Sequence, residues 1–120
     1  MIHKHLLIKA EVLKPPKDRF YIEKWLLDLV NKINMVCAAG PISSYVTKKG
    51  NEGLTAAVLI ETSHISIHVW DKADPALIQF DLYSCKDFNV DIVLTHFSVF
   101  NPVHIEYMLL DRNEKLERRI

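Results

Sequence analysis

The sequence predicts an α+β fold, a two-layer sandwich in which a mainly antiparallel sheet carries two helices on one face. Segments with strand-like alternation outnumber the two segments that have apolar residues at helical spacing. Tight polar turns connect the strands in the middle of the chain, which forces neighbouring strands to run antiparallel. The expected order of elements is β-α-β-β-β-β-α-β.

The first half of the chain is expected to form a strand, a helix and a second strand. Residues 5–13 predict a strand, which Pro15 and Pro16 end. Asp18 is suited to cap a helix whose apolar residues recur every three or four positions, and Gly40-Pro41 is expected to end it. Residues 42–48 alternate weakly, as in a strand, and lead into a polar turn.

The second half is expected to form four strands and one helix. In chain order these are strand 54–62, strand 63–71, strand 76–84, a helix that begins at Asn89 or Asp91 and runs through Val99, and strand 103–110. Asn101-Pro102 is expected to end the helix. The charged tail, residues 111–119, is expected to be frayed or to form a short surface helix.

Length and charge narrow the possible classes of protein. A chain of 120 residues fits one domain, here residues 1–120, with enough buried surface for a core. The 15 lysines and arginines balance the 15 aspartates and glutamates, so we expect no nucleic-acid partner.

The cysteines and the N-terminus bear on location. Cys37 and Cys85 match neither a disulfide framework nor a CxxC motif, which suits a reducing compartment. The N-terminus lacks the features of a signal peptide, and the sequence has no run of about 18 apolar residues. We therefore expect a soluble cytoplasmic protein with no membrane partner.

A polar cluster interrupts the most apolar stretch of the chain. Residues 54–60 suit a buried strand, but Glu61, Thr62, Ser63 and His64 follow before alternation resumes. A buried polar group without a partner costs roughly 1–3 kcal/mol, so a core strand seldom carries such a cluster without a reason. We interpret the cluster as the functional site.

A hairpin closed by residues 71–75 would bring a thiol to this cluster. The register that such a turn favours sets His68 beside Gln79 and brings Cys85 next to Thr62 and Ser63. Two distant segments of the chain would then supply a hydroxyl and a thiol to one place.

Taken singly, these residues have common structural explanations. Ser63 could be an ordinary strand-end hydroxyl, and Cys85 a small buried side chain. No nucleophile elbow accompanies Ser63, so a serine hydrolase is not indicated. His64 and His68 would lie roughly 13 Å apart along a strand, so they cannot share one metal ion, and no metal site is predicted.

The combined motif resembles that of a known family. Gly53-Leu-Thr55, Ser63-His64-Ile-Ser-Ile-His68-Val-Trp70 and Asp81-Leu-Tyr-Ser-Cys85 occur at matching intervals. This arrangement resembles the small prokaryotic S-adenosylmethionine decarboxylases, whose proenzymes depend on a pyruvoyl group. The resemblance implies an α/β sandwich that forms a homodimer, with active sites near the protomer interface.

The resemblance implies self-cleavage between Thr62 and Ser63. Ser63 would attack the preceding carbonyl, convert the amide to an ester and eliminate, leaving a pyruvoyl group as the cofactor without any metal. His68 would assist this step, and Thr55 stands where the family has a supporting serine. The two products would be residues 1–62, the β chain, and residues 63–120, the α chain.

The resemblance also implies how substrate is converted. The pyruvoyl ketone would hold the amine of S-adenosylmethionine as a Schiff base and accept the electrons released with CO2, while Cys85 returns the proton. The product would serve polyamine biosynthesis, that of spermidine. Trp70 could stack on adenine or simply pack, and Asp71 could replace the carboxylate that binds the ribose.

Three departures from the family pattern keep alternatives open. Thr62 replaces a glutamate, Lys72 replaces another glutamate, and residues 48–52 replace an aromatic, proline-containing loop. The last two changes fall on substrate binding. The chain could therefore be a pyruvoyl decarboxylase of another amino acid such as ornithine or arginine, or a non-catalytic, uncleaved homologue that acts as a binding or regulatory partner.

Overall fold

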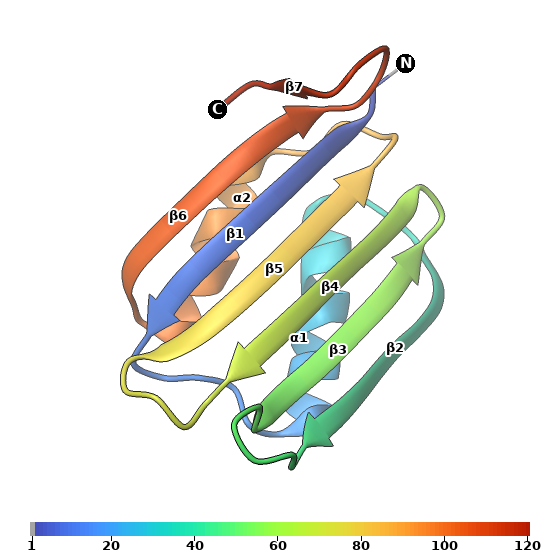
Figure 1. Cartoon of the computed structure of the whole chain (residues 1–120). Coiled ribbons are helices and arrows are strands. Elements are labelled where there is room, and N and C mark those ends of the chain that lie inside the picture. Colours follow the sequence, from blue (N-terminus) through green and yellow to red (C-terminus); the bar gives the residue numbers. More distant parts are fainter. Residues whose placement is uncertain (1) are drawn as a thin grey trace.

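The computed structural model describes residues 2–120 and confirms the α+β sandwich (Figure 1). Its elements are β1 (Lys4–Val12), α1 (Arg19–Lys32), β2 (Cys37–Val46), β3 (Gly53–Ile60), β4 (Ser63–Trp70), β5 (Ala76–Ser84), α2 (Val90–His96), the 3-10 helix η1 (Phe97–Phe100), β6 (Pro102–Asp111) and β7 (Glu117–Arg118). The predicted order is confirmed, with one additional strand at the C-terminus.

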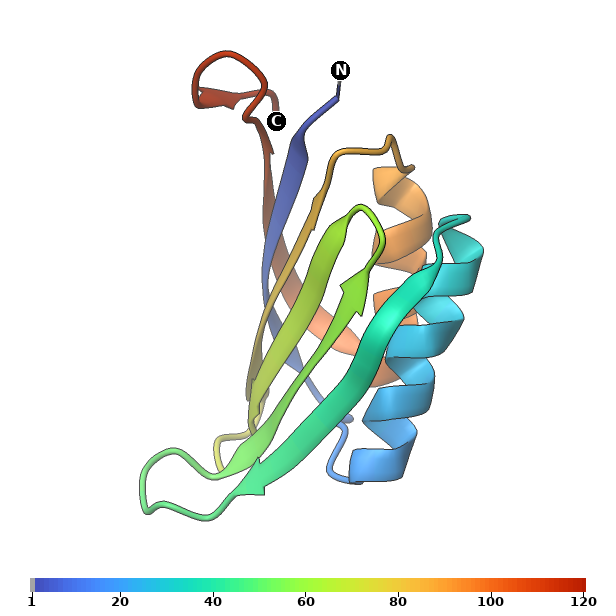
Figure 2. The ribbon, with the colours of Figure 1, turned by 90° about the vertical axis from the view of Figure 1, so that its right-hand side faces the viewer.

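The strands form one antiparallel sheet in the order β2-β3-β4-β5-β1-β6-β7. β1, the first strand of the chain, therefore lies between β5 and β6. Both helices lie on one face of the sheet, and Figure 2 shows no helix on the other, which we call the open face. Within residues 2–120, none of the helices combines the length and the apolarity needed to cross a bilayer.

Strict alternation decides which side chains face the helices. In β4, Ile65, Ile67 and Val69 are buried beneath the helices, whereas His64, Ser66, His68 and Trp70 are only partly buried. Successive side chains of a strand point to opposite faces, so the polar residues of β4 share the open face. One face of β4 thus belongs to the core, and the other face carries polar side chains that ligands can reach.

The first helix ends earlier than predicted. Its start is as expected, because the side chain of Asp18 accepts a hydrogen bond from the N–H of Phe20 at 3.1 Å. The helix ends at Lys32, and Asn34, with a φ of 60°, reverses the chain. Gly40-Pro41 lies inside β2, at a shift of register against β3. A positive-φ glycine and a proline without an N–H suit such a bulge, so the prediction that this pair ends the helix is wrong.

The C-terminal tail is neither frayed nor helical as expected. Leu110 pairs with Arg118, so the tail adds β7 to the edge of the sheet. The N–H of Leu109 donates to the carbonyl of Ile120 at 2.9 Å, and Arg119 lies 3.0 Å from Asp111. Neither the backbone hydrogen bonds nor this ion pair depends on an apolar pattern, which is why the sequence did not predict the strand.

Candidate functional site

Ser63 begins β4 directly after a two-residue turn, Glu61-Thr62. Ile60 and Ser63 face each other across this turn in the β3–β4 ladder. Ser63 has a φ of 155°, a region that residues with a side chain rarely adopt and that typically costs about 1–3 kcal/mol. The backbone is therefore bent and strained at the serine of the polar cluster.

The β4–β5 hairpin brings Cys85 to the same turn. Its register is the predicted one, with His68 opposite Gln79 and Ser63 opposite Ser84. The N–H of Cys85 donates a hydrogen bond to the carbonyl oxygen of Thr62 at 3.1 Å. The cysteine is not in a disulfide, and it is exposed. An N–H directed at a carbonyl oxygen stabilises negative charge that develops there during nucleophilic attack.

His68 lies elsewhere on β4. It is opposite Thr55 in the ladder, and its Nδ1 lies 3.3 Å from the hydroxyl oxygen of that threonine. It follows Ser63 by five positions of extended strand, a distance of about 16 Å. The two motif residues His68 and Thr55 are therefore together, but a single chain does not bring either of them to Ser63. Within the described residues, 2–120, the expected approach of the His68 imidazole to Ser63 is thus not made in one chain.

Trp70 and Asp71 extend the His68 end of the site. The rings of His68 and Trp70 have centroids 6.2 Å apart. Asp71 is only 9% exposed, and the hydroxyl of Tyr45 donates to its Oδ2 at 2.7 Å, a contact that raises the pKa of the tyrosine. Within residues 2–120, Oδ1 of Asp71 is buried without a hydrogen-bond partner. Tyr45 was not predicted, because an isolated tyrosine on a weakly alternating strand carries no signal.

Gly53 has a steric role at this end of the site. Its φ is 148°, and a Cβ there would lie 1.8 Å from the carbonyl oxygen of Val69. No side chain can occupy that space, so β3 can approach β4 this closely only with glycine at its first residue. The Gly53-Leu-Thr55 part of the motif thereby holds Thr55 against His68.

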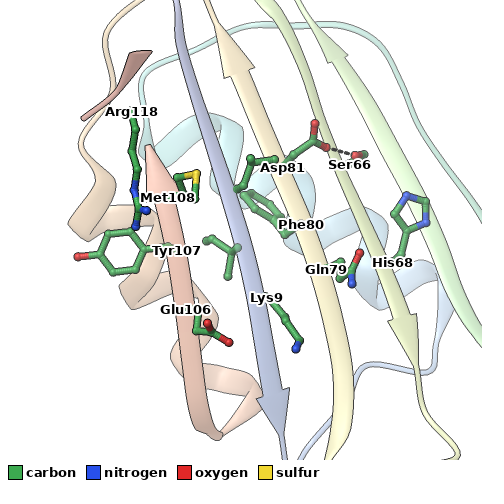
Figure 3. A pocket seen from close by; sticks show the side chains of 12 residues that line it. Lys9, Ser66, His68, Gln79, Phe80, Asp81, Glu106, Tyr107, Met108 and Arg118 are labelled. Atoms are coloured by element: carbon green, nitrogen blue, oxygen red, sulfur yellow. Dashed lines mark hydrogen bonds between the residues drawn. The ribbon is translucent and has the colours of Figure 1, made fainter. Parts of the chain in front are cut away.

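Asp81 is the centre of a hydrogen-bond network on the open face. Its Oδ2 accepts from His5 at 2.9 Å and lies 3.5 Å from Nε2 of His64. Ser66 donates to the other oxygen, as Figure 3 shows. Burial by itself would raise the pKa of Asp81, but the hydrogen bonds from His5 and Ser66 outweigh it and lower the pKa to about 2. Asp81 and Ser66 also line a concavity of about 460 Å³.

The same three residues, His5, His64 and Asp81, have the composition of a metal site, since their donor atoms all lie within 4.8 Å of one another. However, Nη1 of Arg112 lies 3.3 Å from Nδ1 of His5. An arginine can only donate, so Nδ1 accepts and the proton of the neutral ring is on Nε2, which donates to Asp81. That tautomer has no lone pair on Nε2 for a cation, and we assign the cluster to hydrogen bonding.

The lowered pKa of Asp81 predicts a specific dependence of stability on pH. The ionised carboxylate stabilises the fold above the ordinary pKa of 3.8, and this contribution is lost as the pH falls towards 2. We expect Asp81→Asn to lower the free energy of unfolding by about 2 kcal/mol at pH 6, with the difference shrinking below pH 4. Urea denaturation of both proteins between pH 2 and pH 6 measures it. A difference that stays constant over this range would exclude the charge as its source.

These features define a class, an α+β sandwich protein whose site combines a backbone-strained serine with a neighbouring cysteine. The model of one family, S-adenosylmethionine decarboxylase, matches residues 4–113 of the chain. The chain belongs to the S-adenosylmethionine decarboxylase family.

Individual relatives agree with this assignment. The S-adenosylmethionine decarboxylase proenzyme of Hydrogenobaculum sp. (strain Y04AAS1) is 30% identical over 76 residues, which are 59% of this chain and 53% of that protein. The chain thus spans about half the length of that relative. The crystal structure of the adenosylmethionine decarboxylase from Aquifex aeolicus VF5 superposes with a TM-score of 0.71 at 25% identity, covering 95% of this chain and 90% of that one.

Proposed function

We propose that this protein is a self-cleaving, pyruvoyl-dependent decarboxylase of S-adenosylmethionine that acts in the cytoplasm and supplies spermidine biosynthesis. Its family membership supports the substrate and the class of reaction. The observation that carries the proposal is the strained turn, where Ser63 follows a carbonyl that already accepts a hydrogen bond from Cys85. Backbone strain is found most often at functional sites, which favours a catalytic protein over an uncleaved homologue.

The cleavage needs only groups of the chain and one water molecule. The hydroxyl of Ser63 attacks the carbonyl carbon of Thr62, the C–N bond breaks, and the hydroxyl proton passes to the amide nitrogen, which gives an ester. Loss of the α-proton of Ser63 then breaks the ester C–O bond and leaves Thr62 with a free carboxylate. Water replaces the nitrogen at residue 63 and ammonia leaves, so the new N-terminus is a pyruvoyl group.

The residues around the turn fit such a group. When bound in this site, the pyruvoyl carbonyl supplies an electrophile that holds the substrate amine and takes up the electrons released as CO2 leaves. Cys85 is exposed beside residue 63, where its thiol can return a proton to the reacting carbon. At the other end of β4, we assign the carboxylate of Asp71 to a substrate hydroxyl and the ring of Trp70 to the adenine.

We further propose that the working site is formed by two copies of the chain. Ser63 and Asp71 lie at opposite ends of β4, about 26 Å apart along the strand, so one chain cannot present both to one substrate. Strand alternation puts Leu7 of β1 and Leu59 of β3 on the open face, where they are 36% and 54% exposed. A two-fold homodimer that pairs these faces sets the Ser63 end of one β4 over the His68 end of the other.

Release of labelled CO2 tests the activity. We expect wild-type protein to release CO2 from carboxyl-labelled S-adenosylmethionine, and Cys85→Ala to lower the rate by about 100-fold or more, because it removes the proton donor. The variant keeps its backbone N–H, so it should still cleave. Cys37→Ala is the matched control and should keep full activity. Release from labelled ornithine or arginine instead would assign another substrate, and no release from an intact chain would leave a non-catalytic homologue.

A further inference from the structure

We propose that Ser84, to which the family motif gives no role, is a positioning residue for cleavage between Thr62 and Ser63. This inference rests on the proposed self-cleavage. Ser84 is the last residue of β5, lies directly opposite Ser63 in the ladder and is fully buried. A hydroxyl in such a place must be satisfied by the residues around it, and its partners are the segments that the cleavage uses.

On one side, Ser84 fixes the loop that carries Cys85. Its Oγ accepts a hydrogen bond from the N–H of Lys86 at 2.9 Å, which closes a tight turn around Cys85. The N–H of Cys85 is thereby held 3.1 Å from the carbonyl oxygen of Thr62. Nucleophilic attack on that carbonyl moves negative charge onto the oxygen, so the position of this N–H affects the barrier.

On the other side, Ser84 holds the side chain of Thr62. Its hydroxyl lies 3.0 Å from Oγ1 of Thr62, which in turn lies 3.6 Å from the sulfur of Met35. The sulfur is also 3.7 Å from the hydroxyl of Ser84, but a thioether accepts more weakly than an oxygen. The donors therefore run in one direction, from the N–H of Lys86 through both hydroxyls to the sulfur.

This arrangement accounts for the threonine at position 62. The side chain before the cleaved bond ends in a short hydroxyl that reaches the buried Ser84 across the hairpin. Ser84 thus positions both the attacked residue, Thr62, and the loop whose N–H faces the carbonyl of Thr62. The hydrogen bonds of Ser84 go to the side chains of Thr62 and Met35 and to the N–H of Lys86, so we assign it an effect on geometry rather than a step in the chemistry.

The rate of self-cleavage in freshly translated precursor tests the proposal, and it needs no substrate. We expect Ser84→Ala to slow the appearance of the two fragments by about tenfold, the effect of one lost hydrogen bond on a barrier. Ser84→Thr, which keeps the hydroxyl, should recover most of the rate. Ile78→Val is the matched control, because it removes a buried methyl group from the same strand and should cleave at the wild-type rate.

Two further measurements separate positioning from general destabilisation. Thr62→Val removes the partner hydroxyl, and combining it with Ser84→Ala should slow cleavage by less than the product of the two single effects, since both act through one contact. Hydroxylamine cleaves esters, so it should not restore the rate of Ser84→Ala if the first step is slowed. If Ser84→Ala cleaves itself at the wild-type rate, the proposed role of Ser84 is wrong. If the wild-type chain does not cleave, the proposed function is wrong instead.

Discussion

Replacing Ser63 with alanine is expected to leave the chain as a single 13.9 kDa species, whereas the wild-type protein separates into two fragments under denaturing conditions. Alanine has no nucleophile, so the loss of cleavage should be complete, and CO2 release should disappear with it. Intact-mass spectrometry measures the outcome. The fragment masses should sum to that of the precursor plus water minus ammonia, whereas hydrolysis by a protease adds water and retains the nitrogen.

Ser63→Gly is the matched control for the strained backbone. Neither variant can cleave, but glycine adopts a φ of 155° without the clash that a side chain meets. We therefore expect the glycine variant to be more stable than the alanine variant by about 1 kcal/mol in urea denaturation, the reverse of the usual order in a strand. Equal fragments from wild type and Ser63→Ala would mean that a contaminating protease cuts the chain.

Mixing two inactive chains should restore cleavage if the site is shared between copies. His68→Ala alone is expected to cleave slowly or not at all, and Ser63→Ala cannot cleave. In a mixed dimer, the His68→Ala chain keeps its serine and meets the histidine of the Ser63→Ala chain. Only the His68→Ala chain should therefore be cut. This result is expected because the two residues are about 16 Å apart on one strand.

Co-expression of the two variants followed by mass spectrometry reads out this experiment, since each chain has its own mass. The matched control pairs His68→Ala with the double variant Ser63→Ala/His68→Ala, which supplies no histidine and should rescue nothing. If the His68→Ala chain stays intact in both mixtures, the histidine does not act across the interface, and the shared site is refuted.

The local parts of the fold were predictable because local chemistry sets them. The turn before Ala76 fixed the β4–β5 register, and Asp18 capped α1 as expected. The errors have a common cause. The meaning of Gly40-Pro41 depended on a neighbouring strand, and β7 is held by backbone hydrogen bonds to β6. Neither leaves a pattern of apolar side chains that a single sequence can reveal.

The site shows the same division. The hydroxyl and the thiol at the turn were placed together from register alone, and the backbone of Cys85 does meet Thr62. His68 is close to Ser63 in sequence but not in space, because each residue of an extended strand adds about 3.3 Å to the separation. The sequence did not predict roles for Ser84 and Tyr45, because the partner of a single hydroxyl is known only from the three-dimensional structure.

The position of β1 has a consequence for the proposed cleaved form. A break after Thr62 assigns β1, β2 and β3 to one product and β4 to β7 to the other. β1 of the first product lies between β5 and β6 of the second, and all three strands are hydrogen-bonded in one sheet. The two products therefore cannot separate unless the sheet unfolds. The nicked molecule would therefore keep the shape of its precursor, and the new chain end would stay anchored where it was made.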